Sequence, residues 1–130
     1  MSVPCPVRGV VTLAAAAALA GLGACTRNEP KGLAATGKAL SAQKGCISCH
    51  TTDGRPSVGP TWKGVYGSRV VLDDGTTVTA NDAYLTESIL HPSAKTVKGF
   101  KAGQMETVIK ENSITPDQVK ALVAYIKSVR

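Results

Sequence analysis

The feature that most constrains this chain is a pair of closely spaced cysteines followed at once by a histidine. Cys46, Cys49 and His50 form a C-x-x-C-H sequence, the attachment motif for c-type haem. Two thiols three positions apart on a turn can reach both vinyl groups of one porphyrin, and the adjacent imidazole is then delivered beneath the iron. The motif therefore predicts one covalently attached haem c, with His50 as an iron ligand.

Three other uses of paired cysteines fit this sequence less well than haem attachment. A thioredoxin-like redox site needs a βαβ context in a longer domain, and the sequence shows none. A structural zinc site needs a fourth ligand, and the only other histidine of the chain is His91. A structural disulfide across so short a loop would contribute little to stability. Haem attachment is the interpretation we favour.

A six-coordinate haem needs a second axial ligand, and the candidate is Met105. Apart from the initiator, Met105 is the only methionine, and it ends a basic, glycine-containing stretch, residues 98–105, that we expect to be a loop. Its two glycines let the backbone approach the haem closely. No apolar periodicity around Met105 explains it as core filler. The rival ligand is His91, which precedes Pro92 at the end of a predicted helix.

The first 24 residues have the pattern of an export signal. Arg8 is their only charged residue, and an uncharged, alanine-rich stretch follows it. The stretch is shorter and less apolar than a retained transmembrane helix requires. It ends Leu-Gly-Ala before Cys25, which resembles a bacterial lipobox and predicts lipidation of Cys25. The alternative is an ordinary cleavage site with a chance cysteine.

This pattern divides the chain into three parts. Residues 1–24 are a predicted lipoprotein signal peptide, residues 25–33 a lipidated polar tether, and residues 34–130 the folded domain. The predicted location is the periplasmic side of the cell envelope, with the protein held at a membrane by its lipid.

Composition fits a small domain that relies on a cofactor. The chain has 130 residues, enough for one domain, and aromatic residues make up only 4%. A large apolar cofactor would supply the core that the sequence lacks. The net charge is +6, but the basic residues are dispersed, so an acidic protein partner suits the surface and nucleic acid is not expected.

The coarse pattern is helical with one small hairpin. We expect a first helix over Ala34–Cys46, a hairpin of Arg69–Leu72 and Thr76–Thr79, and a helix that Thr79 caps and that continues to about Leu90. A last helix should begin after Thr115 and pack an apolar stripe on the first. Its signals are Pro116, Gln118, Val119, Leu122, Val123, Ile126 and Val129.

Together these motifs resemble class I cytochrome c over residues 34–130. The shared features are C-x-x-C-H near the start, Gly59-Pro60 soon after it, a late methionine, and a terminal helix containing residues 122–127. Residues 58–68, residues 83–90 and the hairpin between them are more specifically similar to the cytochrome c domain of bacterial cytochrome c oxidase subunit II. The chain has no room for that subunit's copper-binding domain, so the expected protein is a free-standing version of the haem domain.

The resemblance implies an all-α class I cytochrome c fold, helices around one covalent haem with a small β-hairpin insertion. It implies that His50 and Met105 are the two iron ligands and that the Pro60 carbonyl holds the His50 ring. It also implies that Gly45 and Tyr125 meet where the first and last helices cross. Glu106 stands where the family usually has proline after the methionine. Residues expected to line the haem or reach its propionates are Trp62, Tyr66, Arg69 and Tyr84.

The function expected from this resemblance is one-electron transfer in a respiratory chain, not enzymatic catalysis. The expected partners are a haem-copper terminal oxidase as acceptor and an upstream reductase or dehydrogenase as donor, with the carrier itself a monomer. Two alternatives stay open, a fixed haem subunit of a membrane complex and an open-site haem enzyme or sensor. Candidate lysines for the rim of a docking face are Lys44, Lys63, Lys95, Lys98 and Lys101.

Overall fold

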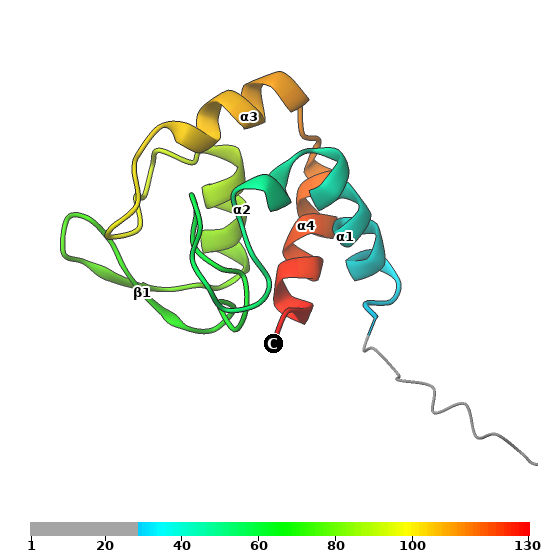
Figure 1. The fold of residues 1–130 in the computed structure, drawn as a ribbon, viewed down its shortest axis with the longest axis horizontal. Helices are drawn as coiled ribbons and strands as arrows, with labels where there is room; N and C mark the ends of the chain where they lie inside the picture. The colour runs from blue at the N-terminus through cyan, green and yellow to red at the C-terminus, as the bar shows by residue number, and fades with distance from the viewer. Residues whose placement is uncertain (1–28) are drawn as a thin grey trace, which may run out of the picture.

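A computed structural model describes residues 29–130, with residues 111 and 112 described by their backbone only. The predicted signal peptide and Cys25 lie outside the described residues. The elements are α1 (Leu33–Gln43), a 3₁₀ turn η1 (Cys46–Ser48), β1 (Arg69–Val71), β2 (Thr77–Thr79), α2 (Asp82–Leu90), α3 (Gln104–Asn112) and α4 (Pro116–Ser128). Figure 1 shows α1 and α4 side by side, while α2, α3 and the hairpin lie on the other side of the turn that follows α1.

The pairing of α1 with α4 is the most extensive contact between elements. It depends on Gly37, because a Cβ there would lie 1.9 Å from the Ala121 carbonyl oxygen and 2.7 Å from Tyr125 Cβ. The prediction that Gly45 meets Tyr125 at this crossing is wrong. Gly45 instead adopts φ 73° between α1 and η1, with space around the position of its missing Cβ. Its role is to turn the chain out of the first helix.

Helix α4 begins where the sequence predicted. Thr115 accepts a hydrogen bond from the Gln118 backbone N–H at 3.3 Å, and the Gln118 side chain accepts one from the Thr115 N–H at 3.0 Å, which completes a capping box. Val119, Leu122, Val123 and Ile126 of the predicted stripe are buried. Helix α1 ends at Gln43, earlier than expected, because Lys44 and Gly45 leave the helical path.

The hairpin and α2 follow the prediction with two adjustments. Strands β1 and β2 pair antiparallel with Val70 opposite Val78, and each strand is one residue shorter than expected. Helix α2 ends at Leu90 as predicted, but Asn81 caps it, not Thr79. The Asn81 side chain accepts a hydrogen bond from the Tyr84 N–H at 2.9 Å, because Thr79 is still held in the β ladder.

Helix α3 was not predicted. Met105 lies in its first turn, not in a loop, and the expected loop ends at Gly103. The helix lacks a side-chain N-cap, since Gly103 precedes it with φ 81°. Among the described residues, no helix is long and apolar enough to span a membrane.

Candidate functional site

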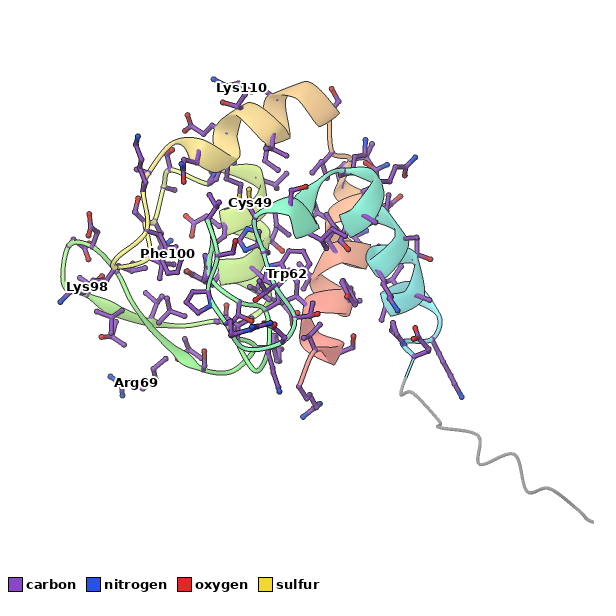
Figure 2. All side chains as sticks on the ribbon, viewed as in Figure 1. Cys49, Trp62, Arg69, Lys98, Phe100 and Lys110 are labelled. Atoms are coloured by element: carbon purple, nitrogen blue, oxygen red, sulfur yellow. The ribbon has the colours of Figure 1, made fainter. Side chains whose placement is uncertain are left out.

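A cavity of about 560 Å³ lies between the turn after α1, the hairpin, α2 and α3. Its walls are mainly apolar, with Leu85 and Ile89 from α2, Ile109 from α3, and Leu122 and Ile126 from α4. In Figure 2, Cys49, Trp62 and Phe100 lie inside the arc that these elements form, while Lys110 projects outward from α3. A space of this size and character suits a large apolar group held by few polar contacts.

The cysteine motif forms one rim of the cavity. Cys46 begins η1, Cys49 directly follows it, and both line the cavity with free thiols. Burial raises the pKa of the Cys46 thiol, and the neighbouring Cys49 adds to the rise. The C-x-x-C spacing therefore places both cysteines at one cavity, as the sequence predicted, because a single tight turn carries them.

The His50 ring is held in place by contacts with Pro60 and Trp62. Its Nδ1 lies 2.8 Å from the Pro60 carbonyl oxygen, which can only accept, so Nδ1–H is the donor. The Trp62 ring stacks on the imidazole with centroids 5.1 Å apart and an interplanar angle of 18°. Burial lowers the pKa of His50, partly opposed by this hydrogen bond, so the ring is neutral at neutral pH. Nε2 is left as the nitrogen that can bind a metal.

The loop before Pro60 is shaped to the same imidazole. A Cβ on Gly59 would lie 2.6 Å from His50 Cε1 and 2.9 Å from Nδ1, closer than side chains pack. Gly59 N–H also donates to the Cys49 carbonyl at 2.9 Å, which ties the loop to the motif. The Gly59-Pro60 pair thus positions the ring by close approach as well as by hydrogen bonding.

Most of the other predicted site residues also line the cavity: Trp62, Arg69, Tyr84 and Met105. Tyr66 is not among the residues that line the cavity. Its ring is 37% exposed, its hydroxyl donates to Asp82 at 3.2 Å, and Lys127 Nζ lies 4.5 Å from the ring centroid. The turn before β1 points Tyr66 toward α2 and α4 on the outer surface.

The rival iron ligand, His91, is exposed at the end of α2 and is not among the residues that line the cavity. Sequence reasoning missed Ser88 and Phe100, which do line it. Ser88 follows Tyr84 by one helical turn, so its place on the same face could have been inferred from helix periodicity. Among residues 29–130, no group of three histidine, cysteine or acidic side chains could hold a metal ion.

Two thiols on one turn, a neutral imidazole and a thioether, all on one apolar cavity, define a site of the class that holds haem covalently. Comparison of the chain with known proteins agrees with this assignment. The cytochrome c family model matches residues 34–130, and the chain belongs to the cytochrome c family. Among solved structures, cytochrome cH from Methylobacterium extorquens is similar, with 28% identity and a TM-score of 0.54 over 75% of this chain and 99% of that one. No curated protein sequence matches.

Membership in this family assigns a class I cytochrome c fold, one covalent haem c and electron transfer rather than catalysis. When bound, the haem iron supplies a one-electron Fe(II)/Fe(III) couple. In the chain itself, Cys46 and Cys49 would anchor the group, His50 would present Nε2 in the orientation set by Pro60, and the apolar lining would shield the group from water. Because the imidazole is already neutral and oriented, little reorganisation is needed for it to bind.

Proposed function

We propose that this cytochrome carries single electrons to a haem-copper terminal oxidase, with iron held by His50 and Met105. The observation that carries the proposal is that both side chains, from elements far apart in sequence, line one apolar cavity beside the cysteine motif. Ligation by histidine and methionine raises the reduction potential, which suits donation late in a respiratory chain. An upstream reductase or dehydrogenase would supply the electron.

The docking surface that we propose lies along the segment leading to α3. Lys98 and Lys101 are exposed and line the edge of the cavity, and Arg69 adds a third exposed cation from β1. Lys95 also lines the cavity but is engaged in an ion pair with Glu87. An acidic patch on the oxidase would meet these cations and speed association, with an effect that weakens as salt rises.

We further propose that Cys25 carries a lipid that keeps the carrier at the periplasmic side of a membrane. Leu33, where α1 starts, is the eighth residue after Cys25, so the fully extended tether reaches at most about 28 Å. A tether this short raises the effective concentration of the carrier near membrane complexes. Membrane fractionation of the full chain and of Cys25→Ser tests it, and equal membrane recovery of both would contradict lipidation at Cys25.

The test of the iron ligands is spectroscopic. The ferric protein should show the weak near-infrared charge-transfer band of a bond between iron and methionine sulfur, and Met105→Ala should lose it. His91→Ala, which removes the exposed rival, should keep it. A covalently bound haem without this band in the parent protein would exclude Met105 as a ligand and reopen the enzyme alternative.

Partner choice needs a kinetic test. The reduced protein should be oxidised by oxidase-containing membranes at a rate that falls with ionic strength, and Lys98→Glu together with Lys101→Glu should slow it. Lys110→Glu together with Lys120→Glu, at exposed lysines that do not line the cavity, makes the same change in net charge and is the matched control. Oxidation that ignores both salt and the lysine changes would contradict the proposed docking surface.

A further inference from the structure

Trp62 connects His50 to a second aromatic ring in the protein core. The Trp62 ring stacks on the His50 imidazole, with ring centroids 5.1 Å apart and an interplanar angle of 18°. Trp62 also packs against Tyr125 of α4 in a T-shaped arrangement, with centroids 5.9 Å apart and an interplanar angle of 89°. Both Trp62 and Tyr125 are only 8% exposed. His50, Trp62 and Tyr125 thus form a continuous series of three rings in contact, which we call the aromatic chain.

The two ends of the aromatic chain reach different hollows of the molecule. His50 and Trp62 line the large cavity, whereas Tyr125 lines a separate groove of about 370 Å³ beside α1. Among the residues that the structure describes, none lines both the cavity and the groove. Small or apolar side chains make up much of the rest of the groove: Ala35, Ala39, Ala42 and Ile47. The aromatic chain therefore leads from the haem cavity through the core to a second place on the surface.

The groove and the docking surface proposed around Lys98 lie on different faces of the molecule. Figure 2 shows Lys98 on the side of the hairpin and of the segment leading to α3, with α1 on the opposite side. Lys98 and Lys101 line the large cavity, whereas the groove is built mainly on α1. A protein bound at one of these two surfaces therefore leaves the other accessible.

The groove lies where the proposed lipid tether joins the folded domain. Glu29 and Pro30, which precede α1, line the groove, and Cys25 is four residues before Glu29. Lys38 of α1 forms an ion pair with Glu29, which ties the end of the tether to the edge of the groove. A lipid at Cys25 would therefore keep this face near other proteins of the same membrane. The partner that best fits the groove is accordingly a membrane protein.

We propose that the groove is an electron-entry surface, at which a membrane-bound electron donor docks while the oxidase occupies the surface around Lys98. One electron passes from the reduced centre of the donor through Tyr125, Trp62 and His50 to the ferric iron. The rings serve as a tunnelling route and are not themselves oxidised or reduced, so no bond forms or breaks and no proton moves. The inference rests on the ligation of iron by His50 proposed above, and it adds where the donor binds.

The chemistry of the groove defines the donor. It should present an apolar side chain to the alanine-lined groove and acidic side chains to Lys31 and Lys44, which lie just before and just after α1. Separate surfaces for entry and exit suit a carrier on a short tether, because it need not turn over between accepting an electron and donating it.

The first test delivers an electron from a known point on each face of the haem-bound ferric protein. A ruthenium photoreductant is attached at Ala39→Cys in the groove or at Lys101→Cys beside the cavity. Tyr125→Leu removes one ring of the aromatic chain, so it should slow haem reduction from the Ala39 label several-fold and leave reduction from the Lys101 label unchanged. Tyr125→Phe keeps the ring and should match the parent at both labels. The midpoint potential should be the same in all three proteins, because Tyr125 does not line the cavity.

Two outcomes would overturn this route. If haem reduction from the Ala39 label is unchanged in Tyr125→Leu, electrons bypass the ring, for example along the covalent path from Ile47 through Cys46. If the substitution slows reduction equally from both labels, its effect is a general structural one.

A docking test keeps the entry surface falsifiable if Tyr125→Leu does not fold. Ala39→Arg places a large charged side chain in the groove at an exposed position, so it should slow reduction of the protein by membranes that contain the upstream reductase or dehydrogenase. Thr36→Arg, exposed on α1 and outside the groove, adds the same charge and is the control. Equal reduction rates in these two variants would overturn the entry surface. Slowed reduction of Ala39→Arg alone, in a protein that oxidase-containing membranes fail to oxidise, would support the entry surface and contradict only the acceptor proposed above.

Discussion

At the scale of single residues, the orientation of the His50 imidazole is set by the protein's own contacts. The Pro60 carbonyl fixes the proton on Nδ1, and the Trp62 ring covers one face of the imidazole. Gly59 supplies the space in which the ring sits. Each contact comes from a loop tied to the motif by backbone hydrogen bonds, so ring orientation and loop conformation depend on each other.

Gly59→Ala should disturb the haem site more than the fold. The added methyl would lie 2.6 Å from His50 Cε1, so the ring or the loop must move. Overpacking of this kind costs about 1–3 kcal/mol, and it should also weaken the bond from Nε2 to iron. Denaturant unfolding and the optical spectrum of the haem-bound protein measure the two effects. Ser57→Ala, an exposed position in the same loop, is the control.

Prediction of site residues from sequence succeeded where covalent spacing sets geometry. Cys46, Cys49 and His50 share one turn, and a five-residue motif leaves little freedom. The prediction for Tyr66 came from the resemblance to an oxidase domain, and in this structure its side chain contacts Asp82 and Lys127 and is not among the cavity-lining residues. Ser88 was missed although it lies one helical turn after Tyr84, a residue that was predicted to line the haem.

At the scale of elements, local signals determined which helices could be predicted. Helix α4 has a capping box, a proline in its first turn and an apolar stripe, and its start was located correctly. Helix α3 begins after a glycine and has no side-chain N-cap. Few of its residues are apolar. Met105, Val108 and Ile109 line the cavity at the i, i+3 and i+4 positions of one helix face, a periodicity too short to predict a helix without a capping residue. An element that packs against a cofactor was thus mistaken for a loop.

Gly37→Ala tests the crossing of α1 and α4. A Cβ would lie 1.9 Å from the Ala121 carbonyl oxygen, which belongs to the backbone of α4 and cannot turn aside. The helices must separate, and because their contact is the largest between elements, we expect a loss of at least about 3 kcal/mol in unfolding free energy. Thr36→Ala, an exposed neighbour on α1, is the control. Unchanged stability of Gly37→Ala would mean that the two helices approach less closely than described.

A surface cluster joins the start of α2 to the end of α4 and should make stability depend on pH. Lys127 Nζ lies 2.8 Å from Asp82 Oδ1, and Tyr66 O–H donates to the same carboxylate at 3.2 Å. Lys127 is the main cause of the lowered pKa of Asp82, relative to its usual 3.8. Because the pKa is lower in the folded state, the contribution is present above about pH 4 and is lost as the pH falls through the folded value.

Asp82→Asn should therefore be slightly less stable than the parent at neutral pH and equal to it in strong acid. The effect is small because the carboxylate is exposed and screened by solvent. Urea unfolding from pH 7 down to about pH 2 measures the difference, and Asp117→Asn on α4 provides a control away from the cluster. A difference between parent and Asp82→Asn that persists at the lowest pH would contradict an origin in ionisation of Asp82.

At the scale of the whole molecule, the haem belongs to the core. The described residues pack Trp62, Tyr84 and Tyr125 with aliphatic side chains of α2 and α4, and the cavity of about 560 Å³ adjoins that cluster. At about 24 cal/mol per Å³, an empty cavity of this size would cost about 13 kcal/mol as an upper bound. That is comparable to the entire stability of a typical domain, about 5–15 kcal/mol, so the fold depends on its occupant.

The chain without haem should accordingly lose cooperative folding. Replacing both cysteines, Cys46→Ala and Cys49→Ala, abolishes covalent attachment while leaving the helices and their caps intact. The helices most affected should be α2 and α3, whose inner faces line the cavity, whereas α1 and α4 hold each other. We expect reduced helical circular dichroism and a broad thermal transition, with amide exchange fastest in α3. Ser48→Ala, which alters the same turn but keeps both thiols, should stay folded. A haem-free double variant that unfolds in one sharp transition near the parent's midpoint would show that the protein core is sufficient by itself.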